Sequence, residues 1–584
     1  MSEGAATPAP PPRSAAAFGA LLASMVAYKL LAACVVPVPL AMLPWLPCGD
    51  VALAAGLAWL VAIAPRAARR WLVGMVVVGV TGWHALAMLS VQALGMPFLP
   101  SMLAGCDAAM QDSVAPYLTW ANGGRVAFLL ALAAIGWRVG RTRTLARTWW
   151  LLAAVAAALL AMVGPAPVHA CHRNPVLAFG RQLLPRAPLL PRVSGEPTVL
   201  ANAAAAPTDA RSGCAQGRSV VVVVLESAAT RFVASAAGQP SAMPFLRQLA
   251  ATGLDCPQAY AVYPESIEGQ VPILCGLPPM PDADPSDYAE HGRSALPQRL
   301  RPHGYRSGLF HAGRFRFLGM QHVLDPMQFD ELADAGTIGG ERESSFGIDE
   351  EATVDALLAF VARQPATQRV LACWLPIAGH HPYSSPPGGS FPSTTQLGCY
   401  QNALQYADRS LARLWTGLCA LRPPEHWLLC IVGDHGQAFG EHDGNFGHSF
   451  ELYEENLRVP LVFVAPGTTL GGACIDTPCT HLDVVPTLLD LLGLPVDASL
   501  LRQRTGGNPV AVHAFTDWGE LQVMRREADW KLIHEPAMGR DRLFDLASDP
   551  QEARDVALQH AERVVRMRQQ SLAFLSATRG STRH

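Results

Sequence analysis

The chain has 584 residues, of which 50% are hydrophobic and only 16% are charged, whereas an ordinary soluble domain has about 25% charged residues. This composition excludes a disordered protein, a coiled coil, a collagen-like fibre and a small disulfide-stapled domain. The net charge of −3 provides no basic footprint for nucleic acid, so no such partner is expected. Only four of the 47 acidic residues lie in the first 170 positions. The sequence therefore predicts a membrane part followed by a water-exposed part.

Five apolar stretches precede residue 166, near 16–36, 50–64, 71–95, 124–137 and 149–165. A membrane-spanning helix needs about 20 apolar residues, and the second and fourth stretches are shorter than that. We expect a multi-pass transmembrane domain of about five helices over residues 1–165. Lys29 falls inside the first stretch, where three roles are open: snorkelling to the interface, pairing within the helix bundle, or contacting a lipid headgroup.

Basic residues mark one side of this membrane domain. Two of its short loops are rich in arginine, whereas the turn at 48–50 and the segment 97–123 contain no Arg or Lys. The basic residues of these loops are Arg66, Arg69, Arg70, Arg138, Arg141, Arg143 and Arg147. Positively charged loops stay on the cytoplasmic side. We therefore expect the amino terminus to lie inside and everything after about residue 166 to lie outside.

The sequence changes in character after the apolar stretches. Residues 166–218 are rich in Pro, Ala, Arg and Gly and predict a linker along the membrane surface. The run SVVVVVLES at 219–227 is typical of a strand buried on both faces. Further apolar runs at 370–378, 427–436 and 459–467 alternate with amphipathic stretches. This alternation predicts a doubly wound α/β domain over residues 219–584, with helices on both faces of the sheet.

Acidic and histidine side chains follow two of the predicted strands. Glu226 comes at the end of the first run, and Asp434 and His435 come at the end of the run at 427–433. Ligands of open α/β sheets bind at the carboxyl ends of the strands, where buried carboxylates need a cation. Two oxygen ligands and one nitrogen ligand suit zinc or manganese. Alternatively, the Asp-His pair is a capped loop with a salt bridge.

Other candidate catalytic residues lie in two segments. In YPESIEGQVPILCGLPP at 263–279, Ser266 opens a predicted helix, where it is either an N-cap or an oxygen nucleophile next to backbone N–H groups that can bind an anion. Four histidines, His380, His381, His442 and His448, occur after later strands or in a glycine-rich loop. Each one alone can be structural, but together they favour a functional site.

This combination resembles the alkaline phosphatase/sulfatase superfamily. It is similar in particular to the membrane-anchored phosphotransferases, which include lipoteichoic acid synthases and lipid A phosphoethanolamine transferases. Five blocks in the expected order carry the resemblance over about residues 219–560: MPFLRQLAATG at 243–253, HGYRSGLFHAG at 303–313, YQNALQYADRSLARL at 400–414, VGDHGQAFGEHDGNFGHSFELYEENLRVPL at 432–461, and WKLIH with RLFDLASDPQEARDVA at 542–557. The five amino-terminal stretches and the outer catalytic domain match that branch as well.

The resemblance assigns roles to individual residues. Glu226, Asp434 and His435 match the metal-binding positions, and Ser266 falls where the family has a nucleophilic threonine that also binds the metal. His380 matches the phosphoryl-contacting histidine of an H-x-P-(F/Y) motif. His448 matches the histidine after the DHG block, and His311 matches a substrate-binding histidine.

Two departures from the family pattern narrow the range of reactions that we expect. Ser266 is followed by Ile-Glu-Gly-Gln and lacks the C/S-x-P-S/A-x-R motif that sulfatases convert to formylglycine, which disfavours sulfate ester hydrolysis. His311 is followed by Ala-Gly-Arg-Phe-Arg-Phe in place of the aromatic-Trp-Asn-Arg patch of lipoteichoic acid synthases, which disfavours a glycerol-phosphate donor.

The resemblance implies an enzyme of the bacterial inner membrane with a periplasmic catalytic domain. We expect it to use zinc or manganese to move phosphoethanolamine or phosphoglycerol from a phospholipid donor to an envelope glycan or lipid acceptor, through a phosphoseryl intermediate on Ser266. Two alternatives stay open. One is a phosphodiesterase or sulfatase-like hydrolase that uses water as the acceptor. The other is a binding or sensor module that keeps the fold without catalysis.

Overall fold

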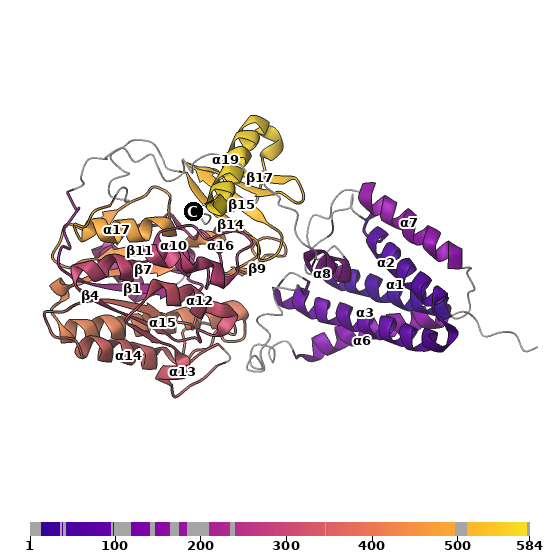
Figure 1. The fold of residues 1–584 in the computed structure, drawn as a ribbon, viewed down its shortest axis with the longest axis horizontal. Coiled ribbons are helices and arrows are strands. Elements are labelled where there is room, and N and C mark those ends of the chain that lie inside the picture. Colours follow the sequence, from indigo (N-terminus) through magenta and orange to yellow (C-terminus); the bar gives the residue numbers. More distant parts are fainter. Residues whose placement is uncertain are drawn as a thin grey trace, which may run out of the picture. The chain divides into compact units, whose positions relative to one another are not determined.

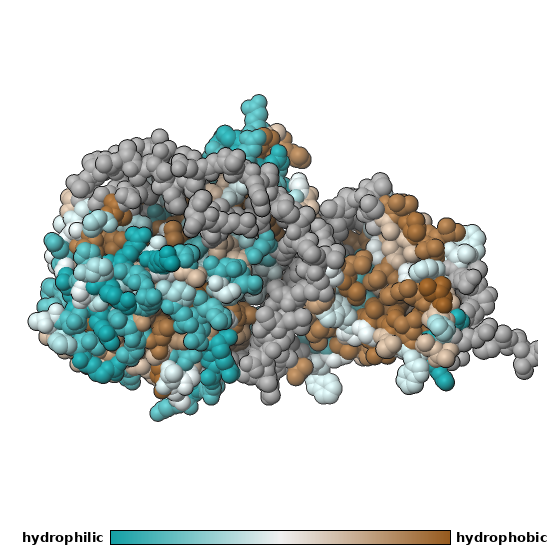
Figure 2. Space-filling model, in the orientation of Figure 1, coloured by the Kyte–Doolittle hydropathy of each residue, from teal (hydrophilic) through white to brown (hydrophobic). Residues whose placement is uncertain are grey.

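The computed structural model describes residues 13–34, 38, 43–94, 97–98, 118–140, 147–163, 174–183, 210–233, 240–344, 346–496 and 511–580. The chain forms two compact units, one built mainly from the amino-terminal helices and the other mainly from residues after Pro188. Figure 1 shows these helices in indigo and purple and the α/β unit in magenta to yellow. In Figure 2 apolar residues are prominent on the visible face of the helical unit, whereas polar residues cover most of the visible α/β unit.

Helices lie at all five predicted apolar stretches: α1 (Arg13–Ala33), α2 (Cys48–Ile63), α3 (Arg66–Leu94), α6 (Trp120–Gly140) and α7 (Arg147–Val163). Among the described residues, three segments are long and apolar enough to cross a membrane: Ser14–Ala33, Ala67–Gln92 and Trp120–Gly140. The short helices are α2 and α7, with 16 and 17 residues. The prediction that the fourth stretch is short was wrong, because α6 has 21 residues and extends through polar and glycine positions at both ends.

The helical unit is held together by small residues and by a buried polar cluster. A Cβ atom on Gly136 would lie 2.0 Å from the carbonyl oxygen of Gly19, so glycine allows α1 and α6 to approach closely. The Lys29 ammonium lies 2.7 Å from Asp50 Oδ2, and the amide of Asn174 donates to Asp50 Oδ1 at 2.7 Å. Of the roles predicted for Lys29, the structure therefore supports pairing within the bundle. Asn174 directly precedes α8 (Pro175–Leu183), inside the predicted linker, most of which lies outside the described residues.

The second unit contains a mixed eight-stranded sheet with the order β12-β2-β11-β7-β1-β6-β4-β5. Its central strands β1 (Ser219–Leu225), β7 (Trp427–Gly433), β6 (Arg369–Leu375) and β4 (Tyr305–His311) are parallel. In contrast, β11 (Leu461–Val464) is antiparallel to β7. The other strands of this sheet are β2 (Leu254–Asp255), β5 (Glu331–Ala333) and β12 (Ala473–Cys474). All four apolar runs predicted as strands are therefore strands of one sheet.

Helices cover both faces of this sheet (Figure 1). Val220, Val222 and Val224 of β1 share a core with residues of α10 (Gln270–Cys275) and α17 (Val484–Leu491). The alternate side chains of β1 share a core with α9 (Pro244–Thr252), α14 (Glu350–Ala362) and α15 (Gln396–Leu421). Since successive side chains of a strand point to opposite faces, the unbroken valine run fits a strand buried on both sides. The predicted doubly wound α/β fold class is confirmed.

A second, antiparallel sheet follows near the carboxyl end and was not predicted. It consists of β14 (Val512–Thr516), β15 (Gln522–Glu527), β16 (Trp530–Glu535) and β17 (Arg540–Asp545), followed by α19 (Ala561–Gly580). Lys531 of this sheet is fully buried between Glu454 and Glu552, at 2.9 Å from each carboxylate. The remaining short elements are β3 (Ala259–Tyr260), α11 (Leu296–Leu300), α12 (Met320–Leu324), α13 (Ala335–Ile338), β8 (Ala438–Phe439), β9 (Phe446–Gly447), α16 (Glu454–Leu457), β10 (Arg458–Val459) and β13 (Cys479–Thr480).

Candidate metal centre

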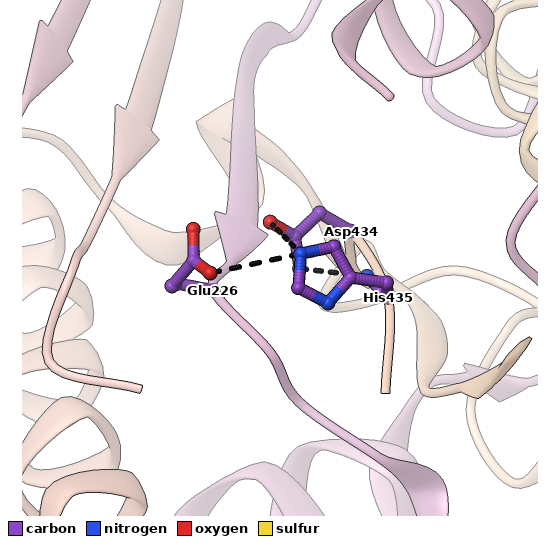
Figure 3. A group of neighbouring side chains, drawn as sticks. All are labelled: Glu226, Asp434 and His435. Carbon is purple, nitrogen blue, oxygen red and sulfur yellow. Dashed lines mark hydrogen bonds and ion pairs between the residues drawn. The ribbon is translucent and has the colours of Figure 1, made fainter. Parts of the chain in front are cut away.

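Two neighbouring parallel strands bring together Glu226, Asp434 and His435. In the register of β1 and β7, Leu225 is opposite Gly433, so the residues that follow each strand meet at the same edge of the sheet. The backbone N–H of Asp434 donates to the carbonyl of Leu225 at 3.0 Å. The N–H of Ser227 donates to Asp434 Oδ1 at 2.8 Å. Figure 3 shows the three side chains converging beyond the strand ends.

The geometry of these three side chains suits a divalent metal ion. Among the described residues, their ligand atoms form a group in which all atoms lie within 4.8 Å of one another. His435 Nε2 is 3.7 Å from Glu226 Oε1 and 3.5 Å from Asp434 Oδ2. The Nδ1 atom of His435 lies 2.9 Å from the carbonyl oxygen of Gly436. A carbonyl only accepts, so Nδ1 carries the proton and Nε2 keeps a lone pair for a metal.

Burial makes the two carboxylates unfavourable as free anions. Glu226 is 6% exposed and Asp434 is 1% exposed. Burial and the charge of Asp434 together raise the pKa of Glu226 to about 7. Burial likewise raises the pKa of Asp434 to about 7, although hydrogen bonds from backbone N–H groups partly offset this effect. A bound cation removes this penalty, so the donor set and its electrostatics both fit a divalent metal.

Ser266 lies directly against this group. Its hydroxyl is 3.0 Å from Glu226 Oε2 and 3.2 Å from Glu226 Oε1. It is also 3.2 Å from His435 Nε2. The serine oxygen can therefore share a metal ion with these residues and stand as a nucleophile at its edge.

The local structure around Ser266 differs from the prediction of a helix start. The helix α10 begins at Gln270 with Gly269 at its N-cap, so Ser266 is not a cap. The neighbouring backbone N–H groups of Ile267 and Glu268 donate to Glu265 Oε2 at 2.8 and 3.0 Å. The prediction that they are available to an anion was therefore wrong, because the Glu265 carboxyl already occupies them.

His380 is held close to the metal centre by a short loop after β6. The loop approaches the backbone of Glu226 so closely that a Cβ atom on Gly379 would lie 2.0 Å from the Glu226 carbonyl oxygen. His380 Nδ1 lies 2.8 Å from the carbonyl of His381, which leaves Nε2 with its lone pair. Burial lowers the pKa of His380, and the charge of Glu226 partly opposes that effect.

The backbone of the loop that carries His380 is held by hydrogen bonds to a buried carboxyl group. Glu350, at the start of α14, accepts hydrogen bonds at Oε1 from the N–H groups of Ile377 and Ala378, at 2.8 and 2.7 Å. Its second oxygen has no hydrogen-bond partner among the residues that the structure describes, and the side chain is fully buried. Burial raises the pKa of Glu350 to about 8.

His448 and His311 complete the set of predicted site residues. The ring of His448 stacks on His435, with centroids 3.9 Å apart and planes inclined at 21°. Burial lowers the pKa of His448 well below its usual value, and the charges of His435 and His380 lower it further. His311 ends β4, and its Nδ1 lies 3.1 Å from the carbonyl of Leu375. Burial lowers the pKa of His311 to about 4, with a smaller contribution from the charge of His380.

Several supporting residues were not singled out from the sequence. Ser227 donates to Glu226 Oε1 at 2.8 Å, and Tyr400 of α15 donates to the Ser227 carbonyl. Gln437 lies between His448 and Tyr383. Ser227 directly follows Glu226, and Gln437 lies two positions after His435, so closeness to a candidate metal ligand in the sequence is a signal for both. Glu350 had none, because its contact joins segments 27 residues apart.

Comparison with known proteins supports this reading of the α/β unit. The Sulfatase family model matches residues 218–494, which contain every site residue described above. This region, which we call the sulfatase domain after the matching model, covers just under half of the chain. The choline-sulfatase of Rhizobium meliloti (strain 1021) is 32% identical over 167 residues, which cover 26% of this chain and 31% of that protein. Arylsulfatase K of Homo sapiens is 27% identical over 175 residues, covering 26% of this chain and 32% of that protein. The chain thus matches about a third of the length of these curated relatives.

Solved structures share the fold of the sulfatase domain. A protein in the alkaline phosphatase superfamily from Vibrio parahaemolyticus superposes with a TM-score of 0.52 at 18% identity, covering 67% of this chain and 93% of that chain. A putative sulfatase from Bacteroides thetaiotaomicron VPI-5482 superposes with a TM-score of 0.51 at 15% identity, covering 62% and 93%. The predicted membership of the alkaline phosphatase/sulfatase superfamily is confirmed.

Proposed function

We propose that this protein is a membrane-bound, metal-dependent phosphotransferase. It moves the headgroup phosphate of a phospholipid, phosphoethanolamine or phosphoglycerol, to a hydroxyl of an envelope glycan or lipid acceptor. The observation that carries the proposal is the contact of Ser266 Oγ with Glu226 Oε2 and His435 Nε2, at 3.0 and 3.2 Å. An unmodified serine at this position is an oxygen nucleophile, since its sequence context lacks the motif for conversion to formylglycine.

The charges at the site support a phosphodiester as the donor. The histidines near Ser266 have a lowered pKa and are therefore neutral near pH 7. A phosphodiester carries about one negative charge and a phosphomonoester about two, so neutral histidines beside the candidate metal centre suit the diester better.

The reaction proceeds in two displacements at phosphorus. A divalent cation, zinc or manganese, held by Glu226, Asp434 and His435 would supply the positive charge that stabilises the serine alkoxide and the phosphoryl oxygens. Ser266 Oγ forms a bond to phosphorus as the bond from phosphorus to the diacylglycerol oxygen breaks. The leaving oxygen takes up the proton that the serine hydroxyl gives up, and diacylglycerol departs. The acceptor hydroxyl then attacks the phosphoseryl group and regenerates the serine.

His380 and His448 assist these steps. The Nδ1 atom of His380 is hydrogen-bonded to a backbone carbonyl, so its Nε2 is free to accept a proton and return it. The stacked position of His448 on His435 brings a second imidazole to the same edge of the sheet. Proton transfer by a positioned imidazole contributes about 10²- to 10⁴-fold to such reactions. His311 is proposed to contact substrate.

A membrane location suits substrates of this class. In the described part of the amino-terminal unit, three helices are long and apolar enough to span a bilayer. An anchor of this kind keeps the site near amphiphilic donors and acceptors. The arginine-rich loops favour a cytoplasmic amino terminus. We therefore propose the bacterial inner membrane as the location, with the sulfatase domain in the periplasm.

A hydrolase is the second candidate, because the curated relatives are sulfatases. To separate the two, the purified full-length protein with zinc or manganese is incubated with phosphatidylethanolamine, phosphatidylglycerol or an aryl sulfate, and its peptides are analysed by mass spectrometry. We expect one headgroup phosphate on the Ser266 peptide and released diacylglycerol. Free headgroup phosphate without an acceptor would favour a phosphodiesterase, and aryl sulfate turnover would favour a sulfatase.

Ser266→Ala tests the nucleophile, with the exposed Ser548→Ala as the matched control. We expect Ser266→Ala to abolish transfer and adduct formation with an unchanged melting temperature. Ser548→Ala should behave as wild type. Wild-type turnover in Ser266→Ala would overturn the assignment.

A further inference from the structure

The histidines of the site share one pattern of hydrogen bonding at Nδ1. In His311, His380 and His435 this atom faces a backbone carbonyl oxygen, at 3.1, 2.8 and 2.9 Å. A carbonyl oxygen can only accept, so each Nδ1 carries a proton and each Nε2 keeps the lone pair. The backbone itself therefore fixes the tautomer of these three side chains.

His448 is different, because a side-chain amide faces its Nδ1 atom. Gln437 Oε1 lies 3.1 Å from His448 Nδ1, and the amide nitrogen of Gln437 donates to the Tyr383 hydroxyl at 2.9 Å. An amide offers an oxygen at one end and an N–H₂ group at the other. Its orientation therefore decides whether His448 Nδ1 donates or accepts.

The surroundings of Gln437 hold this amide in place. Gln437 is 5% exposed and Tyr383 is 7% exposed. The backbone carbonyl of Gln437 accepts from the Arg231 guanidinium at 3.0 Å. Tyr383 packs edge-on against Tyr400, with ring centroids 5.5 Å apart, and Tyr400 in turn donates to the carbonyl of Ser227 beside the metal centre. The amide and its partner thus sit in a packed environment continuous with the metal site.

We propose that Gln437 is a positioning residue that selects the tautomer of His448. With its nitrogen on Tyr383 and its oxygen on His448, Gln437 keeps the proton of His448 on Nδ1 and leaves the lone pair on Nε2. His448 then matches the other three histidines, and all four present the same kind of nitrogen to the reaction. The consequence for catalysis rests on the proposed phosphotransferase function, whereas the tautomer does not depend on it.

The first test observes the tautomer itself. The full-length protein, loaded with zinc and labelled with ¹⁵N in its histidines, is studied by long-range ¹H–¹⁵N correlation, and the His448 signals are assigned by their loss in His448→Asn. We expect the pattern of a proton on Nδ1 in the wild type. Gln437→Glu retains an acceptor and should keep that pattern, whereas Gln437→Leu should lose it. An Nε2–H pattern for wild-type His448 would overturn the proposal.

The second test separates positioning from folding. We expect Gln437→Leu to lower kcat about 10- to 100-fold with KM, zinc content and melting temperature close to wild type. Gln437→Glu should recover most of the lost kcat, and the exposed Gln559→Leu should have no effect. A wild-type kcat in Gln437→Leu would refute the role in catalysis. If wild-type protein transfers no headgroup to any acceptor, the phosphotransferase function fails while the tautomer measurement still decides the present proposal.

Discussion

The buried carboxyl group of Glu350, which binds the backbone of the His380 loop, makes the stability of the sulfatase domain depend on pH. Glu350 has a pKa raised by burial to about 8, compared with an ordinary value of 4.5. Between these values the folded state binds a proton that the unfolded state has released. The free energy of unfolding therefore falls as the pH rises through this window. At about 1.4 kcal/mol for each pKa unit, the loss reaches up to about 5 kcal/mol above pH 8.

Glu350→Gln removes this dependence and preserves the contacts. The amide oxygen can accept from the same N–H groups of Ile377 and Ala378, and it has no charge to desolvate. We expect the variant and the wild type to be equally stable near pH 4.5. The variant should then gain about 1.4 kcal/mol over the wild type per pH unit up to about pH 8.

Urea unfolding of the full-length protein in detergent, followed by tryptophan fluorescence at several pH values, measures this difference. Glu341→Gln, at an exposed position, is the matched control and should show no pH-dependent difference. Because other titrating groups are common to both proteins, their effects cancel in the comparison. A constant difference between Glu350→Gln and wild type from pH 5 to pH 8 would show that Glu350 is ionised in the fold and refute the reasoning.

Two further predictions follow from buried charges. Zinc or manganese should bind more weakly below about pH 7, because protons then compete for Glu226 and Asp434, whose pKa values are each raised to about 7. Titration calorimetry at pH 6 and pH 8 measures the affinity, and equal affinities at the two pH values would contradict the prediction. Lys531→Met should destabilise the domain by about 3–5 kcal/mol, because it leaves the carboxylates of Glu454 and Glu552 buried without their cation. Urea unfolding measures that loss, and a stability within about 1 kcal/mol of wild type would contradict it.

The central strands and the residues at their ends are predictable from the sequence alone. The valine run of β1 and the apolar run of β7 can be recognised as central strands, because a strand buried on both faces has to be apolar along its whole length. Once both strands are parallel neighbours, Glu226 and the Asp434-His435 pair must meet at one edge of the sheet. The positions of the apolar helices were likewise predictable from hydropathy, which is a local property of the chain.

In contrast, the way in which segments distant in the sequence complete the site depends on tertiary packing. Ser266 reaches Glu226 across 40 positions, and the helix after it begins at Gln270 because Glu265 binds the intervening N–H groups. Nothing local shows that Glu350 supports the loop before His380. These contacts depend on which segments the packed core brings together, and a polar residue in an irregular loop has the same sequence pattern whether it binds backbone, substrate or water.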